Sequence, residues 1–322
     1  MAEVLWKRGR ILGKGGFDFV SLASTTTFNF YDDQTLDDVH LPPLIAVKSC
    51  MLSHSQSFQD EREFPKLFQD SPYVIRCFGV SMTEEDQLFL YNLLLEYASG
   101  ESLADCLKNN YSGKGLPEFE VRKHAKNVLL GLSQVHGRGI IHCDIKPHNI
   151  LLVGNDEVAK IADFGLALTL EQSWNGNHGL RGTRRYMAPE SVLHHEYGQE
   201  VDIWAVGCTV YELLTGTPLW KSNEDDAKAD VLDRIASEEP NLENEKLSRE
   251  AIDFLRSCLV KNPCSRWTAD MLLKHPFLNL SKLVDQPAKK RKKQSYMSLL
   301  RRPHHKTAFK TQPHIRDLII EH

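Results

Sequence analysis

Residues 139–153 read GIIHCDIKPHNILLV, a short polar loop between two apolar runs. Its polar positions suit phosphoryl transfer to a hydroxyl group. The carboxylate of Asp144 could accept the hydroxyl proton, the ammonium group of Lys146 could neutralise a transferring phosphoryl group, and the amide of Asn149 could ligate a metal ion. Pro147 would stiffen the loop between them. Taken alone, the stretch is equally compatible with an ordinary polar loop.

A second carboxylate follows in IADFGLA, where Asp163 precedes Phe164 and Gly165. Mg²⁺ prefers oxygen ligands and leaves several coordination positions to substrate phosphates. An amide from Asn149 and a carboxylate from Asp163 would suit that ion, although the fragment alone is also compatible with a β-turn. The two stretches in this order indicate a site for a metal-bound phosphate.

Upstream, ILGKGGFDFV places Gly13, Gly15 and Gly16 between two strand-like segments. Glycine lets backbone N–H groups approach a phosphate closely. A Walker-type loop is disfavoured, because no G-K-[ST] sequence follows and the next element is strand-like. A glycine-rich hairpin turn and a solvated Lys48 at the end of IAVK are the ordinary interpretations of each fragment. In this order, however, Lys48 could reach phosphates that the glycines hold.

The hydrophobic pattern changes along the chain. Residues 4–97 contain several strand-like runs and one helical segment, SFQDEREFPKLFQ, and PPLIAVKSC is expected to form a strand that ends at Lys48. From Pro117 onward the pattern is mainly helical. VDIWAVGCTVYELLTG is apolar on nearly all sides, which predicts a central buried helix that ends at Gly216. REAIDFLRSCLV and TADMLLKHPF predict two further amphipathic helices.

Together, the glycine loop, AVK, HCDIKPHN, DFG and MAPE resemble the signature set of a eukaryotic protein kinase, over roughly residues 5–280. The resemblance implies an α+β, bilobal protein kinase fold with a kinase domain at 1–280. Its small lobe, about 1–97, would hold a small antiparallel β-sheet and one main helix. Its larger lobe, 98–280, would be mainly α-helical, and a flexible basic tail would occupy 281–322.

The resemblance also narrows the class of kinase. Lys146 indicates Ser/Thr specificity, because tyrosine kinases usually carry Ala at that position. VIRCFG, LLLEYASGESLAD and HCDIK resemble plant mitogen-activated protein (MAP) kinase kinase kinases of the MEKK type. A downstream MAP kinase kinase is then the expected protein substrate.

The resemblance implies roles residue by residue. Asp144 would be the catalytic base and Lys146 a γ-phosphate contact, while Lys48 would contact the α and β phosphates of ATP and pair with Glu61. The expected Mg²⁺ ligands are Asn149 and Asp163. The other expected nucleotide-binding residues are Leu12, Gly13, Gly15, Gly16, Val20, Ala46, Leu95 as gatekeeper, Glu96 and Ala98 through their backbones, and Leu151.

The resemblance gives one further residue a place beside the reacting groups and three others an architectural role. Thr183, in GTRRYMAPE, is expected to hydrogen-bond near Asp144 and Lys146. An ion pair between Glu190 and Arg266 would close the large lobe. Asp202 would brace the catalytic loop.

Three positions depart from the family pattern. Asp18 stands where the third glycine of the loop is usual, so its charge should weaken ATP binding. Cys143 replaces an arginine that pairs with a loop phosphate in many kinases, so we expect activity to depend little on activation-loop phosphorylation. An inert, buried Cys143 is favoured over a reactive thiol. Pro65 lies in the helix that carries Glu61, where an interior proline would cost roughly 3 kcal/mol, so that helix should be short or begin late.

Composition limits the partners. Seven scattered cysteines without a C-x-x-C pair predict reduced thiols in the cytoplasm or nucleus and argue against zinc. No apolar run reaches the ~20 residues of a membrane span. The net charge is −4, but residues 289–322 carry ten Lys and Arg against two acidic residues, so the rest of the chain is acidic and no nucleic acid is expected on the kinase domain. The basic run at 289–293 could be a solvated segment or a nuclear signal, and 289–299 resembles a docking motif for partner kinases.

Three functions fit parts of this pattern. An active Ser/Thr kinase is favoured over a pseudokinase that serves as a scaffold or docking protein, because a degenerate kinase commonly loses one of four residues that are all present here: Lys48, Asp144, Asn149 and Asp163. A small-molecule phosphotransferase is disfavoured, because GTRRYMAPE forms a platform for a protein substrate in the family.

Overall fold

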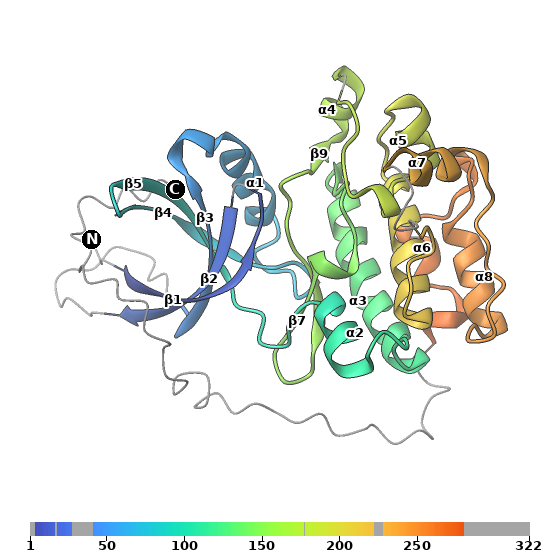
Figure 1. Cartoon of the computed structure of the whole chain (residues 1–322), viewed down its shortest axis with the longest axis horizontal. Coiled ribbons are helices and arrows are strands. Elements are labelled where there is room, and N and C mark those ends of the chain that lie inside the picture. Colours follow the sequence, from blue (N-terminus) through green and yellow to red (C-terminus); the bar gives the residue numbers. More distant parts are fainter. Residues whose placement is uncertain (1–3, 17, 28–40, 177, 222–227, 280–322) are drawn as a thin grey trace.

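The computed structural model describes residues 4–16, 18–27, 41–176, 178–221 and 228–279. A sheet-rich part and a helix-rich part lie side by side (Figure 1). The expected α+β class with two lobes is therefore confirmed. The predicted tail at 281–322 lies outside the described residues.

The small lobe is built on an antiparallel sheet of five strands in the order β1-β2-β3-β5-β4. The strands are β1 (Val4–Lys14), β2 (Asp18–Thr27), β3 (Leu44–Met51), β4 (Cys77–Glu85) and β5 (Leu88–Glu96). β3 is buried along its length except at Met51, as its run of apolar residues predicts for a central strand. It continues past Lys48, which corrects the predicted strand end, because the pairing with β5 extends to the Met51–Leu90 pair.

One α-helix packs on this sheet: α1 (Gln56–Lys66), which follows the short 3-10 turn η1 (Leu52–His54) and contacts β4 and β5. Pro65 lies one residue before α1 ends. The N–H group that proline lacks is thus lost in the last turn and not in the middle of the helix. With 11 residues α1 has an ordinary length, so the expectation of a short helix is wrong, and Pro65 is accommodated by its place in the last turn.

The large lobe is mainly helical (Figure 1). Its helices are α2 (Leu103–Tyr111), α3 (Glu118–Gly137), α4 (Leu170–Asn175), α5 (Pro189–His194), α6 (Glu200–Thr215), α7 (Lys228–Ser237), α8 (Arg249–Cys258) and α9 (Ala269–Leu272). α6 is buried along most of its length and contacts α3 and α8. It ends at Gly216 in the left-handed conformation, with φ 82°, as its sequence predicts.

The segment TADMLLKHPF is less helical than predicted. α9 covers only four residues, and the 3-10 turn η5 (Pro276–Leu278) follows it. Pro276 cannot donate a backbone hydrogen bond to a continuing helix, so the chain turns there.

Two small antiparallel sheets of two strands each place the polar loops of the sequence between the lobes. β6 (Ile140–Ile141) pairs with β9 (Leu168–Thr169), and β7 (Ile150–Val153) pairs with β8 (Val158–Ile161). The loop from 142 to 149 leaves β6 and enters β7, and residues 162–167 leave β8 and enter β9. Both polar stretches are therefore held at both ends by paired strands.

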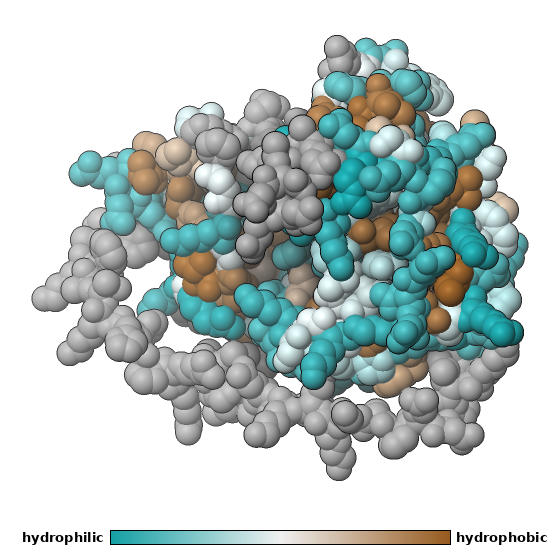
Figure 2. All heavy atoms as spheres, turned by 45° about the vertical axis from the view of Figure 1, so that its right-hand side comes forward, coloured by the Kyte–Doolittle hydropathy of each residue, from teal (hydrophilic) through white to brown (hydrophobic). Residues whose placement is uncertain are grey.

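A continuous apolar core joins the lobes. Phe64 of α1 and Phe68, two residues after α1 ends, belong to the same buried cluster as Leu132 of α3 and Trp204 of α6. On the surface, hydrophilic residues cover most of the face of the large lobe in Figure 2, with smaller hydrophobic groups between them. Among the helices of the described ranges, none is both long enough and apolar enough for a membrane crossing.

Candidate active site

Asp144 is held by four hydrogen bonds to its side-chain carboxylate. One oxygen accepts from the backbone N–H of Thr183 at 3.0 Å and from its hydroxyl at 2.7 Å. The other accepts from Lys146 Nζ at 2.7 Å and Asn149 Nδ2 at 2.9 Å. Thr183 also accepts a hydrogen bond from Lys146 at 2.8 Å. The loop and Thr183 thus fix the carboxylate from both sides.

A buried carboxylate, that of Asp202, accepts hydrogen bonds from the backbone of this loop. Asp202 is fully buried and accepts the backbone N–H groups of His142 and Cys143, both at 2.8 Å. His136 Nε2 lies 2.8 Å from the same carboxylate. Because a buried carboxylate is costly unless hydrogen bonds satisfy it, this arrangement locks the backbone that precedes Asp144. The bracing expected of Asp202 is present, whereas sequence reasoning gave no role to His136.

Lys48 is the centre of a second cluster. Its Nζ donates to both carboxylate oxygens of Glu61, at 2.9 and 2.7 Å, and to Asp163 at 2.8 Å. Burial by itself lowers the pKa of Lys48, but the charges of Glu61 and Asp163 outweigh it and raise that pKa. The ammonium group is therefore charged, and three side chains from β3, α1 and the loop after β8 meet at one point.

The pKa values of the two carboxylates beside Lys48 are shifted in opposite directions. Burial raises the pKa of Glu61 to about 7, against the lowering effect of the Lys48 charge. For Asp163, burial would raise the pKa, but the charge and hydrogen bond of Lys48 lower it overall. The side chain of Asp163 is 45% exposed and that of Glu61 only 5%. Asp163 is thus the carboxylate of the pair that is open to a ligand.

Aromatic packing positions Glu61 and Asp163 together. The ring of Phe164 stacks on Phe64 at 6.3 Å and on Phe68 at 6.2 Å, and His142 meets it edge-on at 4.8 Å. α1 is therefore fixed against the residue that follows Asp163. Phe64 of α1 and Phe68 just after it are both buried, as their spacing from Glu61 predicts.

The glycine loop brings a further carboxylate to this cluster. Asp18 Oδ2 lies 3.7 Å from Lys48 Nζ. A Cβ added at Gly15 would lie 1.9 Å from Asp18 Oδ1, so the Asp18 side chain folds directly over that glycine. An added Cβ at Gly13 or Gly16 would meet nothing within 4 Å. The loop is therefore open at Gly13 and Gly16, whereas the negatively charged side chain of Asp18 fills the space over Gly15.

The remaining predicted nucleotide-binding residues lie along neighbouring strands. Val20 on β2 is opposite Lys48, and Ala46 on β3 is opposite Leu95 on β5. Leu12 lies on β1 before the glycine loop and Leu151 lies on β7 in the large lobe. These residues occupy the two lobes on either side of the segment that connects them.

That connecting segment contains Glu96 and Ala98. The carboxylate of Glu96 accepts from Lys160 Nζ on β8 at 2.8 and 2.9 Å, and its backbone N–H donates to Arg76 at 2.9 Å. Ala98 is half-buried. Sequence reasoning considered only the backbone of Glu96 and missed its ion pair with Lys160, because the two residues are distant in the chain.

The donor set fits a magnesium ion that phosphates help to hold. Asn149 Nδ2 donates to the carboxylate and the backbone carbonyl of Asp144, and the backbone of Asn149 accepts from Ala162, next to Asp163. No group of three or more His, Cys, Asp and Glu side chains in the described residues could hold a metal alone. An amide and one carboxylate oxygen would need further oxygen ligands, which a nucleotide provides.

The segment after Asp163 is held without Cys143. Tyr197 accepts the backbone N–H of Arg181 at 2.7 Å and donates to the carbonyl of Gly179 at 2.9 Å, and Ser173 donates to the carbonyl of Tyr197. Burial raises the pKa of the Cys143 thiol well above its ordinary value. The side chain of Cys143 is half-buried and not fully buried as expected. Tyr197, which the sequence did not single out, anchors the segment.

The large lobe is closed by the expected ion pair. Arg266 donates to the two carboxylate oxygens of Glu190, at 2.7 and 3.1 Å, and both side chains are buried. Arg266 also donates to the backbone carbonyls of Glu200 and Val260. This network ties α5 to α6 and to the turn after α8, away from the reacting groups.

Comparison with known proteins agrees with this geometry. The family model described as protein kinase domain matches residues 6–278. The chain is 43% identical over 280 residues to mitogen-activated protein kinase kinase kinase 20 of Arabidopsis thaliana, a match that covers 85% of this chain and 78% of the relative. It is 39% identical over 281 residues to kinase kinase kinase 18 of the same plant, covering 85% and 77%. Kinase kinase kinase 17 is 38% identical over 277 residues, covering 85% and 69%.

Proposed function

Because this chain belongs to the protein kinase family and is a Ser/Thr protein kinase of the MAP kinase cascade type, we propose that it phosphorylates a MAP kinase kinase on Ser or Thr. ATP would be the phosphoryl donor and Mg²⁺ its metal. The relatives named MAP kinase kinase kinases support this choice of substrate. The proposal depends on one observation: the hydrogen bond of 2.8 Å between Lys48 Nζ and the Asp163 carboxylate. Asn149 links this site to Asp144, because it accepts from the backbone of Ala162 and donates to the Asp144 carboxylate.

Each residue has a step that follows from its contacts. The acceptor hydroxyl forms its new bond to the γ-phosphorus while the bond from that phosphorus to the bridging oxygen of ADP breaks. Asp144 takes the hydroxyl proton, because its carboxylate is already oriented by Thr183 and Asn149. Lys146 lies 2.7 Å from Asp144 and would stabilise the charge of the transferring group from that side.

On the nucleotide side, Lys48 would bind the α and β phosphates and Glu61 would hold Lys48 in place. Asn149 and Asp163 would hold Mg²⁺, which would neutralise phosphate charge when bound. A closely held Lys48 favours an enzyme over a pseudokinase scaffold. The scaffold remains the alternative, and it predicts binding of partner kinases without phosphoryl transfer.

The deciding experiment is transfer of labelled phosphate from ATP and Mg²⁺ to candidate MAP kinase kinases that carry an inactivating substitution. Asp144→Asn should lower kcat by about 10²- to 10⁴-fold, the range for loss of a general base. Asp163→Asn should abolish most activity through the metal site. Asp233→Asn, at an exposed position on α7, serves as the matched control. A wild-type rate no higher than that of Asp144→Asn would favour the scaffold.

Localisation and docking are proposed on the tail, which lies outside the described residues. We propose a cytoplasmic protein whose basic run at 289–293 is a nuclear signal, and a docking role for 289–299. Replacing the five basic residues at 289–293 by alanine should reduce nuclear accumulation of a fluorescent fusion. It should leave transfer to a short peptide unchanged, because that peptide does not use the tail.

A further inference from the structure

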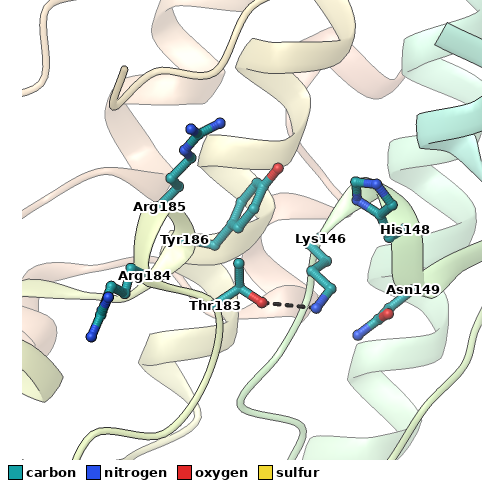
Figure 3. A pocket seen from close by; sticks show the side chains of 7 residues that line it. All are labelled: Lys146, His148, Asn149, Thr183, Arg184, Arg185 and Tyr186. Atoms are coloured by element: carbon teal, nitrogen blue, oxygen red, sulfur yellow. Dashed lines mark hydrogen bonds between the residues drawn. The ribbon is translucent and has the colours of Figure 1, made fainter. Parts of the chain in front are cut away.

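A cavity of about 590 Å³ opens beside Asp144. Figure 3 shows its lining side chains, Lys146, His148, Asn149, Thr183, Arg184, Arg185 and Tyr186. Three of them donate hydrogen bonds to the Asp144 carboxylate: Lys146 and Thr183 at 2.7 Å each and Asn149 at 2.9 Å. A peptide whose hydroxyl reaches Asp144 therefore places its neighbouring residues at this cavity.

The cavity is rich in positive charge. Lys146, Arg184 and Arg185 contribute three cations, and His148 contributes an imidazole. Lys146 is paired with Asp144, so its charge is largely balanced. Arg184 and Arg185 follow Thr183 directly and both are exposed, and their side chains point in different directions from the same short turn (Figure 3).

The opposing negative charge is small. Glu212 of α6 accepts the hydroxyl of Tyr186 at 2.6 Å. Burial raises the pKa of Glu212, while the Tyr186 hydrogen bond and the positive charges of His148 and Arg185 lower it. This half-buried carboxylate faces Arg185 and His148, and Arg184 adds a further cation to the lining, so the balance of the cavity remains positive.

We propose that this cavity selects a protein substrate with an anionic side chain, a carboxylate or a phosphate, close in sequence to the acceptor Ser or Thr. Arginine is suited to this task, since its planar fork binds carboxylate and phosphate through two parallel hydrogen bonds. The inference rests on the proposed function and adds to it the charge class of the substrate sequence. Arg184 and Arg185 are the specificity-determining residues.

The test uses the full chain and a peptide with one acceptor serine in a neutral Gly and Ala background. Each flanking position is replaced in turn by Glu, Gln, Lys or phosphoserine, and kcat/KM is measured. At one or more positions, Glu should raise kcat/KM and Lys should lower it, by about two- to fivefold for each arginine engaged, as expected for exposed ion pairs. A larger gain for phosphoserine than for Glu would identify a substrate that is already phosphorylated.

Charge reversal assigns the effect to the cavity. Arg184→Glu and Arg185→Glu should invert the preference, so that the Lys peptide is used better than the Glu peptide. Arg184→Gln and Arg185→Gln should remove the preference, which keeps the test valid if a reversal variant fails to fold. Arg249→Glu, exposed at the first residue of α8 and outside the cavity lining, should keep the wild-type preference.

The outcomes separate the two proposals. Phosphorylation of the neutral peptide with equal kcat/KM for its Glu and Lys versions overturns the charge inference and leaves the kinase function standing. A preference that survives in both glutamine variants also overturns it. Failure to phosphorylate any peptide or any candidate kinase overturns the proposed function, and the inference with it.

Discussion

Asp18 is the position where one side chain should limit the affinity for ATP. It stands in the glycine loop, folds over Gly15 and lies 3.7 Å from Lys48 Nζ. Its negative charge competes with the phosphates for Lys48 and repels them at the same time. We predict that Asp18→Gly and Asp18→Asn both lower the apparent KM for ATP.

The magnitude follows from the distance and the exposure. Two unit charges about 4 Å apart interact by about 1 kcal/mol in water and about 4 kcal/mol at an effective dielectric constant of 20. The side chain of Asp18 is only 28% exposed, so solvent screens its charge partly and the lower value is the minimum expected effect. About 1 kcal/mol corresponds to a KM lowered about fivefold.

The assay is the initial rate against ATP concentration with Mg²⁺ in excess. Asp18→Asn removes the charge and keeps the shape, whereas Asp18→Gly also loosens the loop, so agreement between the two assigns the effect to charge. The difference from wild type should shrink as salt is added. Glu84→Gln, at an exposed position of β4, controls for a general loss of negative charge. An unchanged or raised KM in Asp18→Asn would refute the electrostatic reasoning.

Three further predictions concern other parts of the site. Burial raises the pKa of Glu61 to about 7 in the folded protein, so the folded state binds an extra proton between about pH 4.5 and 7. The free energy of unfolding therefore falls through that window as pH rises. Glu61→Gln should remove this contribution to the pH dependence, measured by urea titration at several pH values. Tyr197→Phe removes the hydroxyl that holds Arg181 and Gly179, so it should lower kcat and speed proteolysis of the segment after Asp163. Phosphatase treatment of the wild-type protein should change its activity little. Loss of activity through dephosphorylation of Thr169 or Ser173 would contradict this second expectation. Asp202→Ala leaves the backbone N–H groups of His142 and Cys143 without their acceptor, so it should lower the free energy of unfolding by about 2–6 kcal/mol. The measurement is a lower Tm. A Tm within about 2 °C of wild type would show that Asp202 does not stabilise this loop.

The sequence determined much of the chemistry because the reacting residues come in short segments. Asp144, Lys146 and Asn149 lie within six residues of one loop, so their mutual placement depends on local backbone more than on packing. The central helix was predictable for a similar reason: α6 is apolar all round, and Gly216 can take the positive φ that ends it. The three loop glycines likewise mark a backbone that must come close to a ligand.

Other features depended on how distant elements pack. The strand β3 runs past Lys48 because its neighbour β5 continues there, and the segment around α9 is cut short by Pro276. Pro65 is harmless only because α1 ends next to it. These boundaries are set by pairing partners and neighbouring elements, which a local pattern does not contain.

The tertiary structure alone decided which distant side chains share a site. His136 and Tyr197 carry no motif of their own, yet one meets Asp202 and the other holds the activation segment. Likewise, the sequence predicts Arg184 and Arg185 only as part of a substrate platform, and folding shows that they line a cavity beside the Asp144 carboxylate. The physical reason is that sequence spacing fixes geometry over one turn or loop, whereas contacts across the fold depend on the packing of whole helices and strands.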